Sequence, residues 1–245
     1  MQATLWEFRH RWWIIVLIFA AAFLAYNLDP VNSGVAFVRW LARHFGTPAS
    51  ENAYRLVFFA GALLLFLAAF LRTSGTSYLK AEVMRDTRVH SERLVADGPY
   101  RYVRNPLYLG NILMSVGIGV LASRIGFLIL SFGMTLFVMR LILREEAELL
   151  RSQGDSFRRY CAAVPRLLPS LRPRVPSGEI LPHWGQAFRA ELMCWLLALA
   201  SAAYALTLNL KVYWAIAIPG LVSSWLMKRP PTKEASARLE ERNGG

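Results

Sequence analysis

The residues best suited to chemistry form one polar run, Asp97-Gly98-Pro99-Tyr100-Arg101-Tyr102-Val103-Arg104-Asn105-Pro106-Leu107-Tyr108-Leu109-Gly110. Within it, Asn105 and Pro106 predict a helix start, because Asn can cap free backbone N–H groups and Pro tolerates the first helical position. Such a helix end carries unpaired N–H groups and the positive end of the helix dipole, which suit a carboxylate or phosphate. Arg104 adds a bidentate donor for the same anion. The run therefore predicts an anion-binding site.

Adjacent carboxylates supply a second candidate, at the end of a hydrophobic stretch that reads Arg140-Leu141-Ile142-Leu143-Arg144-Glu145-Glu146. Consecutive helical residues point about 100° apart. We therefore expect one glutamate to face a pocket and the other to face water or arginine. The plain alternative is a salt-bridge cluster at the membrane surface, with Arg144 and Glu148 one helical turn apart.

The elements that must position these residues are membrane helices. Hydrophobic residues make up 55% of the chain, charged residues 18%, and the mean hydropathy is +0.34, which is outside the usual range for a soluble domain. About 20 mostly apolar residues cross a membrane as a helix, and such stretches lie near 12–28, 54–71, 107–122, 125–143, 190–208 and 212–227. The sequence predicts an all-α polytopic membrane helix bundle with about six transmembrane helices.

The distribution of Lys and Arg predicts which connections lie in the cytoplasm, because cytoplasmic loops carry the excess of cations. Cations are dense in the N-terminal segment, in 72–106 (including Arg72) and after the fourth stretch, and sparse in the connections between. Both termini and the polar run are therefore expected in the cytoplasm, and the protein in a membrane of the bacterial inner (cytoplasmic) type. The net charge of +12 is assigned to anionic lipid headgroups rather than to nucleic acid.

The first stretch resembles a signal peptide in its apolar core, but an uncleaved helix is the better interpretation. Trp12, Trp13 and Tyr26 at its ends are typical of interfacial anchors. Gly117-Ile118-Gly119 has the spacing of a dinucleotide-binding loop, yet it lies inside a membrane stretch, where small residues usually permit close helix packing.

The sequence divides the chain into five parts. They are an N-terminal transmembrane hairpin (1–71), a polar core with two membrane helices (72–169), a Pro-rich connection (170–187), a C-terminal hairpin (188–228) and a disordered tail (229–245).

The two polar segments together resemble a known family, the isoprenylcysteine carboxyl methyltransferase-like membrane methyltransferases, which are related to the phospholipid methyltransferases. The resemblance lies in Leu94-Val95, Gly98-Pro99-Tyr100, the run 104–110, Glu145-Glu146, and Val164-Pro165-Arg166. It covers roughly residues 92–169.

The resemblance implies S-adenosyl-L-methionine as methyl donor, bound between the third and fourth membrane helices, and a lipid or isoprenoid-linked acceptor. Residue-by-residue matching gives the expected cofactor-binding positions Glu92, Leu94, Val95, Gly98, Tyr100, Arg104, Asn105, Pro106, Leu107, Tyr108 and Glu145. Position 92 is His in the carboxyl methyltransferases, and position 105 is His in many members. Asn105 cannot titrate near neutrality, so a proton acceptor is not expected there.

Arg140, Arg144 and Glu146 are the predicted catalytic residues. In members that methylate a carboxylate, an arginine shortly before the glutamates orients it, and here Leu141 stands at the closest equivalent position between those two arginines. Two other functions stay open. Sterol-reductase-like membrane enzymes share a similar Gly-Pro-Tyr and Arg-x-Pro-x-Tyr signature with a nicotinamide cofactor, and a non-catalytic lipid-binding protein would use the same residues as anchors.

Overall fold

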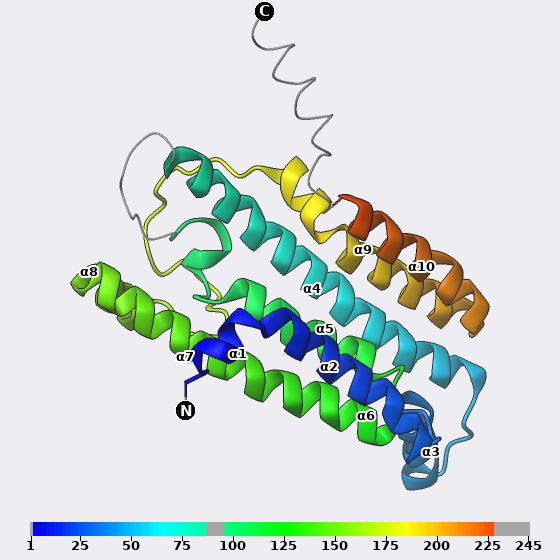
Figure 1. The fold of residues 1–245 in the computed structure, drawn as a ribbon. Helices are drawn as coiled ribbons and strands as arrows, with labels where there is room; N and C mark the ends of the chain where they lie inside the picture. Colours follow the sequence, from blue (N-terminus) through cyan, green and yellow to red (C-terminus); the bar gives the residue numbers. More distant parts are fainter. Residues whose placement is uncertain (1, 87–95, 228–245) are drawn as a thin grey trace, which may run out of the picture.

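The computed structural model describes residues 2–86 and 96–227, and this part of the chain is built from helices (Figure 1). In chain order they are α1 (Leu5–Arg9), α2 (Arg11–Leu24), the 3₁₀ helix η1 (Ala25–Asn27), α3 (Ser33–Phe45), α4 (Glu51–Asp86), the 3₁₀ helix η2 (Gly98–Arg101), α5 (Pro106–Gly119), α6 (Arg124–Leu128), the π-helical segment η3 (Ile129–Gly133), α7 (Met134–Gln153), α8 (Asp155–Ala163), α9 (Trp184–Thr207) and α10 (Leu210–Met227).

Six helical segments correspond to the six predicted hydrophobic stretches. Three are long and apolar enough to cross a membrane, namely Glu51–Leu79, Arg124–Gln153 and Trp184–Thr207. Three shorter apolar segments accompany them, namely Arg11–Asn27, Pro106–Gly119 and Leu210–Ser223. The all-α membrane bundle is thus confirmed. The division of the chain into parts stays a prediction, and α4 crosses the boundary at residue 71 without a break.

Helix α4 lies in the middle of the bundle, with α5 on one side and α9 on another, and α10 packs against α9 (Figure 1). Small residues bring α4 and α5 together. A Cβ atom on Gly117 would lie 2.8 Å from the carbonyl oxygen of Gly61, and one on Gly61 would lie 3.1 Å from the carbonyl oxygen of Gly117. The glycines of this stretch thus serve close helix packing, as predicted.

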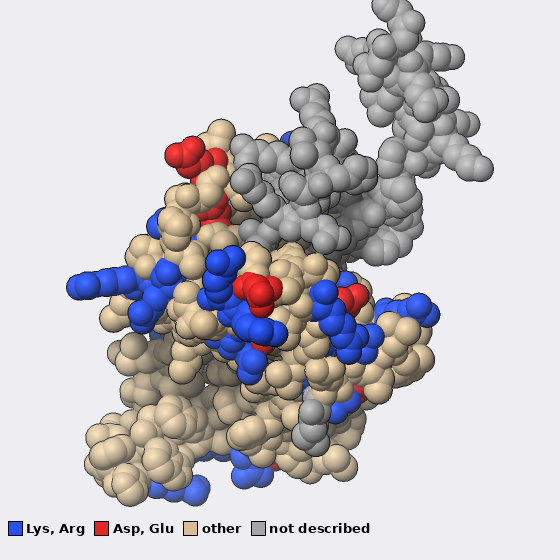
Figure 2. All heavy atoms as spheres, turned by 90° about the vertical axis from the view of Figure 1, so that its left-hand side faces the viewer, with Lys and Arg blue, Asp and Glu red and all other residues tan. Residues whose placement is uncertain are grey.

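Cations are more numerous at one end of the bundle than at the other. Figure 2 shows the end on the left of Figure 1, with Lys and Arg side chains spread over it. Exposed arginines of the elements at this end include Arg9, Arg151, Arg158, Arg159, Arg172 and Arg174. At the other end, Arg124 pairs with Asp29 at 2.8 Å and Arg55 with Glu51 at 2.6 Å, so acids offset these two cations.

A connecting strap, residues 164–183, links α8 to α9 and is hydrogen-bonded to the polar run. Backbone N–H groups of Ser170 and Arg174 donate to the carbonyls of Tyr102 and Arg101, both at 2.9 Å. The polar run and the strap, whose paired residues are 68 and 73 positions apart in sequence, are therefore one structural unit at the basic end.

Asp97 is the centre of that unit. Its buried carboxylate accepts hydrogen bonds from the Ser177 hydroxyl (2.9 Å) and from the backbone N–H groups of Gly178 (2.8 Å) and Ile180 (3.0 Å). Burial alone would raise the pKa of Asp97, but these donors outweigh burial and hold the pKa below its ordinary value. Asp97 is therefore a charged acceptor that fixes the strap.

Candidate functional site

The predicted helix start at Pro106 is confirmed, because α5 begins there. The predicted role of Asn105 as a side-chain cap is wrong. Its amide makes no capping hydrogen bond and donates instead to Glu146 Oε1 and to the carbonyl of Arg166, both at 3.2 Å. The Nδ2 donor of Asn105 is bound to the Glu146 carboxylate on α7, a charge-assisted hydrogen bond, and the Oδ1 acceptor that capping requires makes no hydrogen bond to the start of α5.

Glu146 is the acceptor that joins three segments. Arg166 of the strap donates from Nε (3.0 Å) and Nη2 (2.8 Å) to Oε2 of Glu146. Arg104 approaches Oε1 of Glu146 with its Nη1 at 3.5 Å, and both side chains of this pair are only 11% exposed. Glu146 is therefore the glutamate that faces arginine, and two cations offset its charge.

Glu145 takes a different partner, as the 100° rotation between neighbouring residues predicts. The Tyr108 hydroxyl, one turn into α5, donates to Glu145 Oε1 at 2.7 Å. Tyr108 also packs beside Phe137 and Leu141 of α7. The first turn of α5 and the end of α7 are thus joined by two separate polar contacts, one through each glutamate.

Helix η2 shapes the approach to this contact region. Gly98 has a φ of +55°, and a Cβ atom there would lie 2.1–2.5 Å from the ring of Tyr78 on α4. Tyr100 is buried, and its carbonyl accepts a 2.7 Å hydrogen bond from the Tyr160 hydroxyl of α8. Burial raises the pKa of Tyr160, so that hydroxyl stays a donor.

The two predicted catalytic arginines bind the N-terminal segment. Arg140 Nη2 contacts both carboxylate oxygens of Glu7 at 2.9 and 2.8 Å, and Arg144 Nη1 donates to the carbonyl of Ala3 at 2.9 Å. The hydrogen bond from Arg140, with a further one from the Thr4 backbone, lowers the pKa of Glu7 from 4.5 to about 2. The catalytic role of Arg140 and Arg144 stays a prediction.

Of the remaining predicted cofactor-binding residues, some lie against α4 and others lie outside the described part of the chain. Pro106 and Leu107 lie against Gly75 of α4, where a Cβ atom would be 3.3 and 3.2 Å from their side chains. Leu107 therefore contacts α4 rather than the two glutamates. Glu92, Leu94 and Val95 lie outside the described residues. Arg166 is a site residue that the sequence did not single out, although it ends the Val164-Pro165-Arg166 motif.

The central part of the chain is similar to known methyltransferases. Residues 56–153 match the family model described as phospholipid methyltransferase. A protein-S-isoprenylcysteine O-methyltransferase of Schizosaccharomyces pombe is 32% identical over 111 residues. This alignment covers 43% of the chain and 46% of the relative, so the chain spans about half the length of the curated relative it matches. No solved structure matches. The resemblance to the isoprenylcysteine carboxyl methyltransferase-like and phospholipid methyltransferase family is confirmed by these matches over the part of the chain that holds Asn105, Tyr108 and both glutamates.

Proposed function

We propose that the protein transfers a methyl group from S-adenosyl-L-methionine to a lipid or isoprenoid-linked acceptor in the membrane, at a carboxylate, amine or thiol. The observation that carries this proposal is the meeting of Glu145 and Glu146 with the first turn of α5. That contact region falls within the match to the methyltransferase family model.

The described residues fit the anionic end of such a donor. The first turn of α5 has no side-chain cap, so its N–H groups are available to a carboxylate. Arg104 Nε is buried and has no hydrogen-bond partner among the described residues. A buried donor without a partner is costly, and a ligand carboxylate would satisfy it.

The described residues also fit the cationic and hydroxyl groups of the donor. Glu145 is bound by the Tyr108 hydroxyl alone among the hydrogen bonds of the described residues, and a carboxylate has lone pairs for further donors. Glu146 already meets two arginines and an amide. We therefore assign the donor's amino or ribose hydroxyl groups to Glu145 and the shaping of the site to Glu146.

When bound, the cofactor supplies a methyl group activated by its sulfonium. The chain's own task is then to hold two reactants in line and to exclude water, since this transfer needs position above all. Tyr108 and Glu145 orient one another, and Asn105 has no basic nitrogen. For an amine or thiol acceptor we propose that the proton leaves to solvent at the basic end.

A cavity beside η2 supports a lipid-like acceptor. It has a volume of about 460 Å³ and lies between α4, η2, the strap and the start of α9. Its walls include Phe70, Tyr78, Tyr102 and Trp184, and Arg101 also lines it. Apolar walls with a cation suit an amphiphile with an acidic head. We place this end at the cytoplasmic face of a bacterial inner membrane, because the cations gather there.

Calorimetric titration of the purified, detergent-solubilised protein with S-adenosylhomocysteine tests the proposal. We expect saturable binding that weakens at least about tenfold, or 1.4 kcal/mol, in Glu145→Ala and in Tyr108→Phe. The matched control is Glu148→Ala, which removes an exposed acid three residues along α7 and should leave the affinity unchanged.

Two other results would redirect the assignment. Binding of NADPH without S-adenosylhomocysteine would indicate a membrane reductase. Equal affinity in wild type and both site variants, or no binding of either compound by folded protein, would contradict the site and favour a non-catalytic lipid-binding protein.

A further inference from the structure

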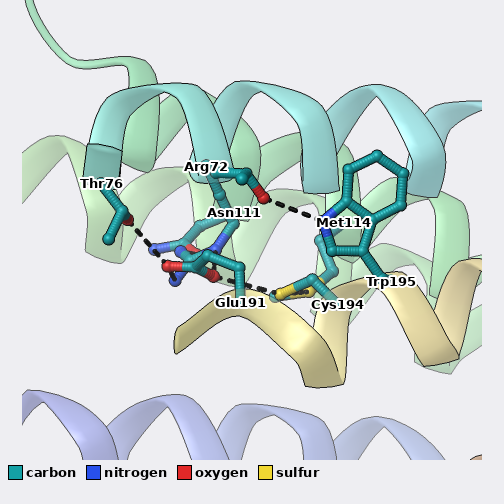
Figure 3. Close-up of polar contacts among 8 residues, drawn as sticks. Arg72, Thr76, Asn111, Met114, Glu191, Cys194 and Trp195 are labelled. Carbon is teal, nitrogen blue, oxygen red and sulfur yellow. Dashed lines mark hydrogen bonds and ion pairs between the residues drawn. The ribbon is translucent and has the colours of Figure 1, made fainter. Parts of the chain in front are cut away.

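A second polar cluster lies inside the membrane-spanning part, on the side of α5 that faces α4 and α9. Arg72 of α4 donates to Glu191 of α9 from Nε at 2.7 Å and from Nη2 at 3.1 Å (Figure 3). The Thr76 hydroxyl donates to the same carboxylate at 3.0 Å, and Arg72 also binds Asn111 of α5. The cluster joins three helices.

The two charged side chains of this cluster are largely buried. The side chain of Arg72 is 14% exposed and that of Glu191 is 8% exposed. Arg72 lies on α4 within the candidate span Glu51–Leu79, so it is part of a helix and not of the connection in which the sequence placed it. A largely buried ionised group is costly unless it is paired. Each of these two charges therefore requires the other.

A further polar contact in the seam between α4 and α9 is the hydrogen bond from the Trp195 indole N–H to the Thr73 hydroxyl at 2.9 Å. The buried residues of α9 are Ala187, Glu191, Cys194, Ala198, Ala200, Ser201 and Ala205, and all but Ala200 recur at spacings of four and three. Apart from Glu191 these buried side chains are small and uncharged, so on their own they fix the register of α9 only weakly. A single buried polar group in such a seam selects one register, as it does in coiled coils.

The register of α9 determines where the strap lies, because α9 begins directly after it. The His183 N–H donates to the carbonyl of Ser77 on α4 at 3.1 Å. A few residues earlier, Gly178 and Ile180 are held by Asp97 next to η2. A shift of α9 by one turn, 5.4 Å, would pull these contacts apart and move Trp184 out of the wall of the cavity.

We propose that Arg72 and Glu191 form a register lock that seats the C-terminal hairpin and so holds the strap against η2. Both are positioning residues. The family match ends at residue 153, so Glu191 comes from a part of the chain that it does not cover. The hairpin α9–α10 is thus a required part of the site. The consequence for donor binding rests on the proposed function, whereas the effect on the strap does not.

Hydrogen–deuterium exchange of the full-length protein in nanodiscs tests the lock. In Glu191→Gln we expect the Gly178 and Ile180 amides to exchange about tenfold faster, which corresponds to 1.4 kcal/mol of lost protection. Asp29→Asn is the matched control, because it breaks an ion pair at the opposite end. It should leave these amides unchanged.

The double variant Arg72→Met/Glu191→Met distinguishes a change in the register of α9 from a loss of overall stability. Replacing a buried pair by apolar residues often preserves stability, so we expect a folded protein whose strap still exchanges about tenfold faster than wild type. Wild-type protection of the strap in either the double variant or Glu191→Gln would overturn the lock, since the other contacts between α4 and α9 would then set the register. If wild type binds no S-adenosylhomocysteine, the proposed function fails while the exchange result still decides the lock.

Discussion

Replacing Gly98 with alanine tests the geometry of η2 most directly. The substitution has two costs that add. An L-residue at a φ of +55° is strained by about 1–2 kcal/mol. The new Cβ would also overlap the Tyr78 ring, whose nearest atom is 2.1 Å away, and overpacking of this kind costs about 1–3 kcal/mol. We therefore expect Gly98→Ala to lower the free energy of unfolding by about 2–5 kcal/mol.

Gly46 provides the matched control, because it has a φ of +65° and nothing within 4 Å of its would-be Cβ. Gly46→Ala should lose only the backbone part, about 1–2 kcal/mol. Unfolding in mixed detergent and SDS micelles, followed by circular dichroism, measures both variants. Donor affinity, measured on the same samples, should fall in the Gly98 variant alone.

A double-mutant cycle with Tyr78→Ala measures how much of the destabilisation by Gly98→Ala comes from overlap with the Tyr78 ring. In a Tyr78→Ala background, Gly98→Ala should lower the free energy of unfolding by about 1–3 kcal/mol less than it does in the wild-type background. Equal destabilisation by the two glycine substitutions, or no coupling with Tyr78, would refute the close approach of η2 to α4.

Two further results are expected. The lowered pKa of Glu7, about 2, means that its pair with Arg140 contributes full stability above pH 4.5 and loses that contribution as the pH falls toward 2. The difference in melting temperature between wild type and Glu7→Gln should thus be constant from pH 7 to 5 and narrow below it; a difference that grows on acidification would contradict the pair. Tyr160→Phe removes the hydrogen bond from the Tyr160 hydroxyl to the Tyr100 carbonyl and should cost about 0.5–1.5 kcal/mol in the same unfolding assay, while a neutral effect would contradict that hydrogen bond.

The sequence predicted those features of the fold that depend on residues close together in the chain. The hydrophobic stretches predicted the six apolar helical segments, though not the short helices α1 and α8, and Pro106 located the start of α5 because its ring fixes a helical φ and its missing N–H is not needed there. The different partners of Glu145 and Glu146 followed from the rotation of about 100° between consecutive helical residues.

Contacts between distant segments could not be predicted in the same way. Asn105 was expected to cap its own helix, and only the placement of α7 shows that its amide donates to a carboxylate instead. Arg72 was assigned to a connection because a charge ends a hydrophobic window. Its partner, Glu191, is 119 residues away, and no local pattern links them.

This long separation matters for biogenesis. Helix α4 is synthesised well before α9, so Arg72 is inserted while its counter-ion has not yet been made. We expect its long side chain to reach toward the headgroups at first and to turn inward only when Glu191 arrives. Packing of the hairpin α9–α10 against α4 is then the step that completes the bundle. A ribosome-stalled chain ending before residue 191 should leave the Arg72 side chain accessible to guanidine-specific labelling.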